Sequence, residues 1–375
     1  MRLLVPLGTR PEIVKLAPVV QALAARPAVL EVRTVATGQH YDPALTDRFF
    51  DDLALTPDAR WDVGGDEGQR VGQILTLAFR EIADQRPDAV LVLGDTYTVP
   101  LFCLAARRHA VPVIHLEAGL RSHNELSVEE THRRLAAAAA SLHLAPTELA
   151  ARNLRAEAVP PERIRVVGNP VIDVLRTAGP PRRPPAERRG IVLTAHRPTN
   201  VDDPERLERL IDLAARLRAE IGPVTFPLHP RTRTRLAAVD GLRRLEACGV
   251  GLLPPLPYPA MLSAIAGAQV IVTDSGGLQE EASWFGVPVV VLRHSTPRWE
   301  GVEAGTSVLT GLDPGAALAA AAFFTTPDEQ RRVAAEPCPY GDGHTAVRVA
   351  GLLAGAEVQD LLRLREPAPP VPALP

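Results

Sequence analysis

Several features that are common in proteins are scarce in this 375-residue sequence. Lysine is nearly absent: of 41 basic residues only Lys15 is a lysine, and the others are arginines. The three cysteines form an odd set without metal-site spacing, which favours free thiols in a reducing cytoplasm. No apolar run reaches 18 residues, so we expect no transmembrane helix and no membrane partner. The net charge of −3 gives no indication of a nucleic-acid partner.

Missing motifs exclude several classes of enzyme. The first turn lacks the GxGxxG pattern of nicotinamide-dependent enzymes, and the chain has no Walker A sequence. It also lacks the GxSxG elbow of α/β-hydrolases. The ten histidines are scattered and form no HExxH motif. We therefore expect neither a nicotinamide cofactor nor a metal ion bound by clustered histidines.

Short apolar runs alternate with helical patterns in two series, which predicts parallel sheets built from βαβ units. The expected strands of the first series are Leu3–Leu7, Val29–Val35, Ala89–Leu93, Val111–Leu116 and Ile164–Val167. Those of the second series are Ile191–Leu193, Val224–Leu228, Val250–Leu253, Val270–Thr273 and Val287–Leu292. The predicted fold class is α/β, with two doubly wound Rossmann-like domains and the active site in the cleft between them.

The composition also predicts where the domains end. Residues 1–176 are expected to form the N-terminal domain, and the Pro- and Arg-rich stretch 177–190 is expected to be an exposed linker. Residues 191–345 form the predicted C-terminal domain. A helix over 346–365 is expected to pack back on the first domain, and residues 366–375 are expected to be a disordered tail. The Ala-rich stretch Leu135–Leu144 is predicted to be one well-packed helix.

Polar residues follow nearly every predicted strand, where parallel α/β sheets gather their ligands. In the first domain these are Arg10, Lys15, Asp95, His115 and Glu117, and in the second they are His196, Arg197, His229, Asp274 and Ser275. Asp95 and Glu117 end consecutive strands, which suits one as proton acceptor and the other as donor. The alternative is that both are structural carboxylates that cap loops. Glu129 and Glu130 are further carboxylates, of which at least one is expected to be solvated.

The segment Val272–Gly286 predicts an anion site. A strand ends in Asp-Ser, two glycines allow a tight turn, and a helix follows. Backbone N–H groups at a helix start, with the Ser275 hydroxyl, can bind a phosphate or diphosphate. Glu281 lies one turn further on, where a carboxylate could accept both ribose hydroxyls. The alternative is an ordinary helix start with Ser275 as its N-cap.

The ordered motifs resemble those of the non-hydrolysing UDP-N-acetylglucosamine 2-epimerases, from residue 1 to about residue 350. The matching segments are GTRPEIVKLAPV, TGQHYDP, LVLGDTYT, HLEAGLRS, VEETHRR, GNPVIDVL, LTAHRPTNVDDPERL, PLHPRTR, TDSGGLQEEA, the stretch Arg293–Gly305, and PYGDGHTA.

The resemblance implies a glycosyltransferase-B-like fold and a homodimer that interconverts UDP-GlcNAc and UDP-ManNAc without cofactor or metal. Loss of the C2 proton and of UDP would give a 2-acetamidoglucal, and re-addition would invert C2. By resemblance the catalytic carboxylates are Asp95, Glu117 and Glu129. The residues that would bind the UDP-sugar are Arg10, Lys15, Arg133, His196, His229, Ser275, Gly276, Gly277, Glu281 and Arg298. Lys15 would supply a compact ammonium where a guanidinium would not fit.

Some positions depart from the family pattern. Thr199 replaces a glutamate, His132 replaces an asparagine, and the stretch from His294 to Trp299 is altered around Arg298. These departures leave open an altered UDP-aminosugar as substrate. The motifs are also compatible with a hydrolysing 2-epimerase that releases ManNAc and UDP, with a retaining glycosyltransferase, and with a nucleotide-sugar-binding regulator without turnover.

Overall fold

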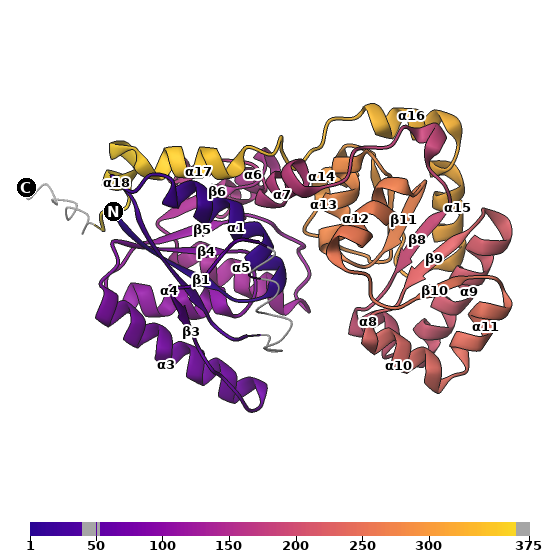
Figure 1. Cartoon of the computed structure of the whole chain (residues 1–375), viewed down its shortest axis with the longest axis horizontal. Helices are drawn as coiled ribbons and strands as arrows, with labels where there is room; N and C mark the ends of the chain where they lie inside the picture. Colours follow the sequence, from indigo (N-terminus) through magenta and orange to yellow (C-terminus); the bar gives the residue numbers. More distant parts are fainter. Residues whose placement is uncertain (40–49, 51–52, 365–375) are drawn as a thin grey trace, which may run out of the picture. The chain divides into compact units, whose positions relative to one another are not determined.

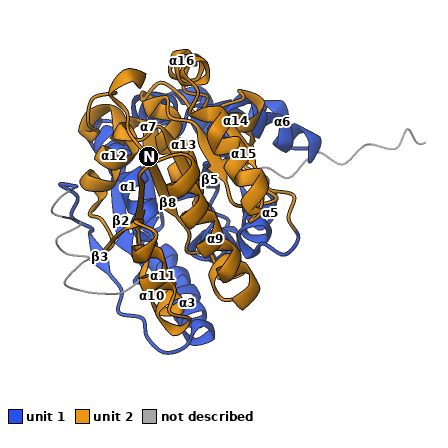
Figure 2. Ribbon diagram, turned by 90° about the vertical axis from the view of Figure 1, so that its right-hand side faces the viewer, with its two compact units in different colours: residues 1–119, 125–170, 345–375 blue, residues 120–124, 171–344 orange. Residues whose placement is uncertain are grey.

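The computed structural model describes residues 1–39, 50 and 53–364, so the predicted tail 366–375 lies outside the described residues. Within them the chain divides into two compact units, which Figure 2 colours separately. Unit 1 comprises Met1–Gly119, Glu125–Pro170 and the described residues from Thr345 onward. Unit 2 comprises Leu120–Asn124 and Val171–His344.

The chain passes from unit 1 to unit 2 at Pro170, ahead of the expected linker. Helix α7 (Pro170–Ala178) causes this difference, because its apolar residues Val171, Ile172 and Leu175 are buried in a core of unit 2. The stretch 177–190 therefore belongs to unit 2, where it includes the single 3-10 turn η2 (Pro185–Glu187).

Unit 1 contains a parallel sheet in the order β3-β2-β1-β4-β5-β6-β7, as far as the chain is described (Figure 1). The first and central strands have long apolar, buried runs, as expected for a parallel sheet covered on both faces. The strands are β1 (Arg2–Leu7), β2 (Glu31–Ala36), β3 (Ala59–Arg60), β4 (Ala89–Leu93), β5 (Val113–Leu116), β6 (Leu142–Ala145) and β7 (Ile164–Val166). The helices are α1 (Arg10–Ala24), α3 (Glu67–Gln85), α4 (Thr98–Arg108), α5 (Val128–Ala139), α6 (Glu148–Ala156), η1 (Pro161–Arg163), α17 (Thr345–Ala354) and α18 (Ala356–Leu361).

Unit 2 repeats this architecture with a parallel sheet in the order β10-β9-β8-β11-β12-β13. Its strands are β8 (Ile191–Thr194), β9 (Val224–Pro227), β10 (Gly251–Leu253), β11 (Val270–Thr273), β12 (Val289–Val291) and β13 (Ser307–Leu309). Its further helices are α8 (Pro198–Val201), α9 (Pro204–Glu220), α10 (Pro230–Ala238), α11 (Gly241–Ala247), α12 (Tyr258–Gly267), α13 (Gly276–Phe285), α14 (Trp299–Glu303), α15 (Pro314–Phe324) and α16 (Pro327–Ala335). The predicted α/β class with two doubly wound sheets is confirmed.

Each of the ten predicted strands overlaps an observed strand, whereas β3, β6 and β13 were not predicted. The prediction of one helix over Leu135–Leu144 is wrong at its end. Helix α5 ends at Ala139, Ala140 adopts an extended backbone, and β6 begins at Leu142. A strand as short as Leu-His-Leu-Ala, directly after an alanine run, cannot be told from helix by periodicity. In place of the expected helix over 346–365, α17 and α18 lie in unit 1, and α17 packs against α1 (Figure 1).

A buried arginine, Arg188, stabilises the end of helix α13 in unit 2. Arg188, 2% exposed, donates to the carbonyl oxygens of Phe285 (2.8 Å) and Gly286 (2.5 Å) at the end of α13. Its third bond goes to the carbonyl of Arg183 (3.1 Å). A cation at this end of a helix is favoured by the helix dipole. Burial, and then the charge of Arg182, lowers the pKa of Arg188.

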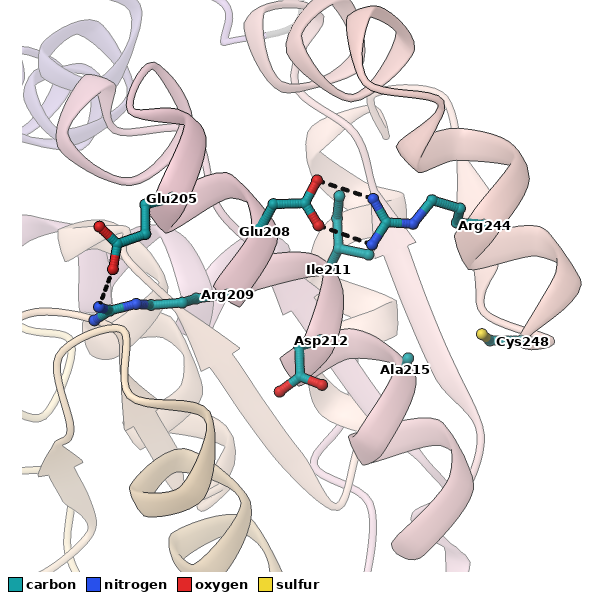
Figure 3. Close-up of a pocket in the computed structure, with 8 residues that line it drawn as sticks. All are labelled: Glu205, Glu208, Arg209, Ile211, Asp212, Ala215, Arg244 and Cys248. Carbon is teal, nitrogen blue, oxygen red and sulfur yellow. Dashed lines mark hydrogen bonds and ion pairs between the residues drawn. The ribbon is translucent and has the colours of Figure 1, made fainter.

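We expect Arg188→Met to lower the free energy of unfolding by about 2 kcal/mol, because it leaves buried carbonyl oxygens without their donors. The matched control is Arg209→Met, which removes an exposed arginine paired with Glu205 (Figure 3) and should cost only about 0.5 kcal/mol. Urea unfolding followed by circular dichroism measures both. Equal losses for the two variants would contradict the proposed role of Arg188.

Candidate functional site

Glu117 lies in a buried polar cluster at the end of β5. Lys15 Nζ donates to Glu117 Oε1 at 2.6 Å, and Asn169 Nδ2 donates to the same oxygen at 2.9 Å. All three residues are buried. Glu117 has a φ of 62°, a left-handed backbone that is unfavourable for a residue with a side chain and recurs at functional sites. Its other oxygen faces Gly94, where a methyl group would lie 3.4 Å from Glu117 Oε2.

The structure places the ammonium of Lys15, a residue predicted to bind the UDP-sugar, on Glu117. Its contact to the sugar nucleotide stays a prediction. Lys15 comes from the middle of α1, whose first residue, Arg10, is exposed. A buried ion pair needs good geometry and further hydrogen bonds to offset the loss of hydration. Here Asn169 supplies such a bond. The arrangement fixes the direction of the Glu117 carboxylate.

Asp95 follows β4, the neighbour of β5, and pairs with a different cation. Arg133, from α5, forms an ion pair with Asp95 and donates to Glu130 Oε2 at 2.8 Å. The Asp95 side chain is 27% exposed, against 4% for Glu117. A ring nitrogen of His132 lies 2.8 Å from the Asp95 carbonyl oxygen. Asp95 is thus the more accessible of the two predicted acid–base groups.

Glu129 and Glu130 have different environments in the first turn of α5. Glu130 is buried against Arg133, whereas Glu129 is half-buried and accepts a bond from the Ser127 hydroxyl at 2.6 Å. The structure therefore brings Arg133 to Asp95 as well as to Glu130. It leaves Glu129 at the more open position of the pair.

Glu12 is a buried carboxyl group that the sequence analysis missed. Its Oε2 accepts from the Thr9 N–H at 2.6 Å, and its Oε1 accepts from the Thr96 hydroxyl at 2.7 Å. Burial raises the pKa of Glu12 to about 7; the bonds from Thr96 and Thr9 lower it, and the charge of Asp95 raises it further. The sequence signal was the capping box Thr9-x-x-Glu12 at the start of α1.

In unit 2, Asp274 directly follows β11 and is fully buried. It accepts from the backbone N–H groups of His196 and Arg197 and from Asn200 Nδ2, at 2.9–3.1 Å. Burial disfavours its charged form, but the bonds from His196, Arg197 and Asn200 outweigh that, so the pKa of Asp274 is lowered. Asp274 therefore holds the loop after β8 beside the start of α13.

An anion site is predicted at the start of α13. Ser275 is its N-cap and makes no side-chain cap bond, and the first N–H groups of a helix have no partner within it. A methyl group at Gly277 would meet no atom within 4 Å, so there is open space beside the first turn of the helix. Arg298 lies beside Gly276, with a guanidinium nitrogen 3.2 Å from where a methyl group would be, and donates to buried Glu280 at 2.9 Å.

Two histidines and a carboxylate complete this region. The rings of His196 and His229 lie 5.5 Å apart, and His196 Nδ1 is 3.1 Å from Asp274 Oδ1. The pKa of His229 is lowered by partial burial and then by the charges of His196 and Arg231. Glu281 is buried in α13 near Tyr258, whose pKa is raised by burial and then by Glu281.

A separate open hollow lies on α9 and α11 and contains none of the predicted residues (Figure 3). Its charged side chains are largely paired with each other, as in Glu208 with Arg244 and Glu205 with Arg209. Among the residues that the structure describes, no group of three or more His, Cys, Asp or Glu side chains could hold a metal ion. In the same residues, no helix has the length and apolarity to span a membrane.

Comparison with known proteins identifies the family. The sequence profile described as UDP-N-acetylglucosamine 2-epimerase matches residues 21–354. A UDP-N-acetylglucosamine 2-epimerase of Bacillus subtilis is 36% identical over 364 residues, which cover 93% of this chain and 94% of the relative. A UDP-2,3-diacetamido-2,3-dideoxy-D-glucuronate 2-epimerase of Pseudomonas aeruginosa is 33% identical over 366 residues, covering 94% and 99%.

A solved structure gives the same result. The crystal structure of Methanocaldococcus jannaschii UDP-GlcNAc 2-epimerase in complex with UDP-GlcNAc and UDP is 32% identical, with a TM-score of 0.83. The similarity covers 94% of this chain and 99% of that one. The fold, the profile match and the sequence identity agree, and the chain belongs to the UDP-N-acetylglucosamine 2-epimerase family.

Proposed function

We propose that the protein inverts C2 of UDP-N-acetylglucosamine to give UDP-N-acetylmannosamine, reversibly and without net hydrolysis. The observation that carries this proposal is the pair of carboxylates at the ends of β4 and β5, Asp95 and Glu117, each held by its own cation. Unit 2 supplies the open, N–H-rich start of α13 with Arg298 beside it, which suits a diphosphate.

The proposed reaction needs no cofactor, because the electron pairs and the proton can all be accounted for with the substrate and the two carboxyl groups. One carboxylate takes the C2 proton while the bond between C1 and the diphosphate oxygen breaks. The C–H electron pair becomes the second bond between C1 and C2, and the C–O pair leaves with UDP. In the return step the diphosphate oxygen adds to C1, and the opposite face of C2 receives a proton from the other carboxyl group. Glu129 supports either transfer, and His196, His229, Ser275, Gly276, Gly277, Glu281 and Arg298 bind UDP and the sugar.

Lys15 acts in this proposal through Glu117. A point charge fits the single oxygen that it shares with Asn169, whereas a guanidinium is broader and would displace one partner. This role differs from the direct contact to UDP that the resemblance implied. Both roles need the compact ammonium, so only a measurement that separates binding from proton transfer tells them apart.

A modified UDP-aminosugar is the second candidate substrate. The Pseudomonas aeruginosa relative is named for a diacetamido-glucuronate substrate and is nearly as similar as the UDP-GlcNAc epimerases. The altered stretch around Arg298 is consistent with a different sugar substituent. The reaction would be the same at C2.

The state of the three cysteines supports the proposal that the protein is located in the reducing cytoplasm. Cys103, Cys248 and Cys338 are all free, as in a protein of the reducing cytoplasm.

On the packed helices α4 and α5, Leu104 and Leu135 are about half exposed, at 50% and 52%. We propose that this face of unit 1 forms a homodimer. Light scattering should then give a mass twice the chain mass of 40.2 kDa. The variant Leu135→Glu should lower the measured mass towards that of the monomer.

We expect the C2 hydrogen of UDP-GlcNAc to exchange with deuterium in D2O while UDP-ManNAc forms, as NMR would show. Free UDP should not accumulate, because it re-adds to the intermediate. Steady release of UDP with free ManNAc would instead identify a hydrolysing enzyme. The same assay on UDP-diacetamido-glucuronate tests the second substrate, and retained protium on every sugar tested would refute epimerisation.

We expect Lys15→Arg to lower the exchange rate roughly tenfold to a hundredfold, because the carboxylate is displaced from its position. The affinity for UDP, measured by calorimetry, should change less than about threefold. The control Arg80→Lys, an opposite exchange at an exposed site, should behave like the wild type. A large loss of UDP affinity with an unchanged rate at saturation would place Lys15 on the nucleotide instead.

A further inference from the structure

Glu12 joins two segments of unit 1 that are far apart in the sequence. It lies in the first turn of α1, and its Oε1 accepts from Thr96, 84 residues further along the chain. Its Oε2 accepts from the Thr9 N–H in the same turn. The side chain is only 6% exposed, so the carboxyl group is largely removed from water between these two donors.

The space around Glu12 is closely filled. A methyl group on Gly8 would overlap Glu12 Oε2 and would lie 2.9 Å from the Thr98 hydroxyl oxygen. The Thr98 hydroxyl in turn donates to Gln39 at 2.6 Å. Two sets of hydrogen bonds, Thr9–Glu12–Thr96 and Thr98–Gln39, therefore lie side by side among the segments that follow β1, β2 and β4. Thr96, in the first set, lies next to Asp95 in the chain.

We propose that Glu12 is a positioning residue for Asp95. Its carboxyl group holds Thr96 against the first turn of α1, and this fixes the turn that presents Asp95. The inference rests on the proposed function, because proton transfer by Asp95 is the step that the position of this turn controls. Buried polar groups of this kind restrict a loop to one arrangement when every member of the network has its partner.

A role in helix capping alone is the competing explanation, since Glu12 is also the N3 residue of a capping box. Thr96→Val separates the two roles. It removes the hydroxyl that reaches Glu12 and keeps the shape of the side chain, while the bond from Thr9 to Glu12 stays. If capping were the whole role of Glu12, Thr96→Val would leave turnover unchanged.

The experiment compares wild type, Thr96→Val, Glu12→Ala, Glu12→Gln and the double variant Glu12→Ala/Thr96→Val. We expect Thr96→Val and Glu12→Ala each to lower kcat roughly tenfold or more, with KM and UDP affinity nearly unchanged. The double variant should be no slower than the slower single one, because both remove one interaction. Glu12→Gln should recover most of kcat, since its amide can accept from Thr9 and donate to the Thr96 oxygen.

Asp313→Ala is the matched control for the loss of a cap. Asp313 is exposed and accepts from the Ala316 N–H at 2.8 Å at the start of α15, so its removal weakens a helix start in unit 2. It should leave kcat unchanged. Normal kcat in Thr96→Val, or rate losses that multiply in the double variant, would overturn the proposal.

A second readout does not depend on turnover. The 13C signal of the Asp95 carboxyl group, assigned with Asp95→Asn, should shift and titrate differently in Thr96→Val than in wild type. An unchanged titration would overturn the positioning role even if the wild type were an active epimerase. If the wild type exchanges no C2 proton on any UDP-sugar, the proposed function fails, and the carboxyl titration still decides whether Glu12 positions Asp95.

Discussion

The buried ion pair between Lys15 and Glu117 is the constraint on which the arrangement of unit 1 depends. It joins α1 to the end of β5, and removal of either partner would leave an uncompensated buried charge. Glu12 lies three residues before Lys15, and both are buried along α1. One helix thus contacts both regions that carry predicted catalytic carboxylates: Lys15 reaches Glu117, and Glu12 reaches the loop of Asp95.

The scarcity of lysine agrees with how the cations of this chain are used. Arginines occupy positions where one side chain must contact several acceptors in different directions: Arg133 contacts Asp95 and Glu130, and Arg188 contacts three carbonyl oxygens. The planar guanidinium with its five donors suits such positions. At Glu117 the acceptor is one oxygen that already has Asn169 as a donor, and there a compact ammonium fits.

The sequence predicted the positions of the strands along the chain, and the residues at their ends, better than it predicted the contacts of those residues. Strand ends follow from apolar runs, and parallel strands bring their carboxyl ends to one edge. Whether Lys15 contacts a ligand or Glu117 depends on how α1 packs against the end of β5, and these two residues are 102 positions apart in the chain. No local sequence pattern carries that information. Glu12 was missed because Thr-x-x-Glu is a common cap, and only burial beside Thr96 distinguishes it.

Each unit has a buried carboxyl group that holds a neighbouring loop, but the pKa values of the two groups are shifted in opposite directions. In each, a buried carboxyl group at a strand end or helix start holds a neighbouring loop: Asp274 in unit 2 and Glu12 in unit 1. Asp274 receives backbone and side-chain donors together with His196, so its pKa falls and its charge is permanent near neutrality. Glu12 is buried with fewer donors, and burial, with a further contribution from the charge of Asp95, raises its pKa to about 7. The charged Asp274 can hold its several donors firmly beside the start of α13. Glu12, with a pKa of about 7, is partly protonated at neutral pH and therefore adds less negative charge beside Asp95, the proposed proton-transfer group.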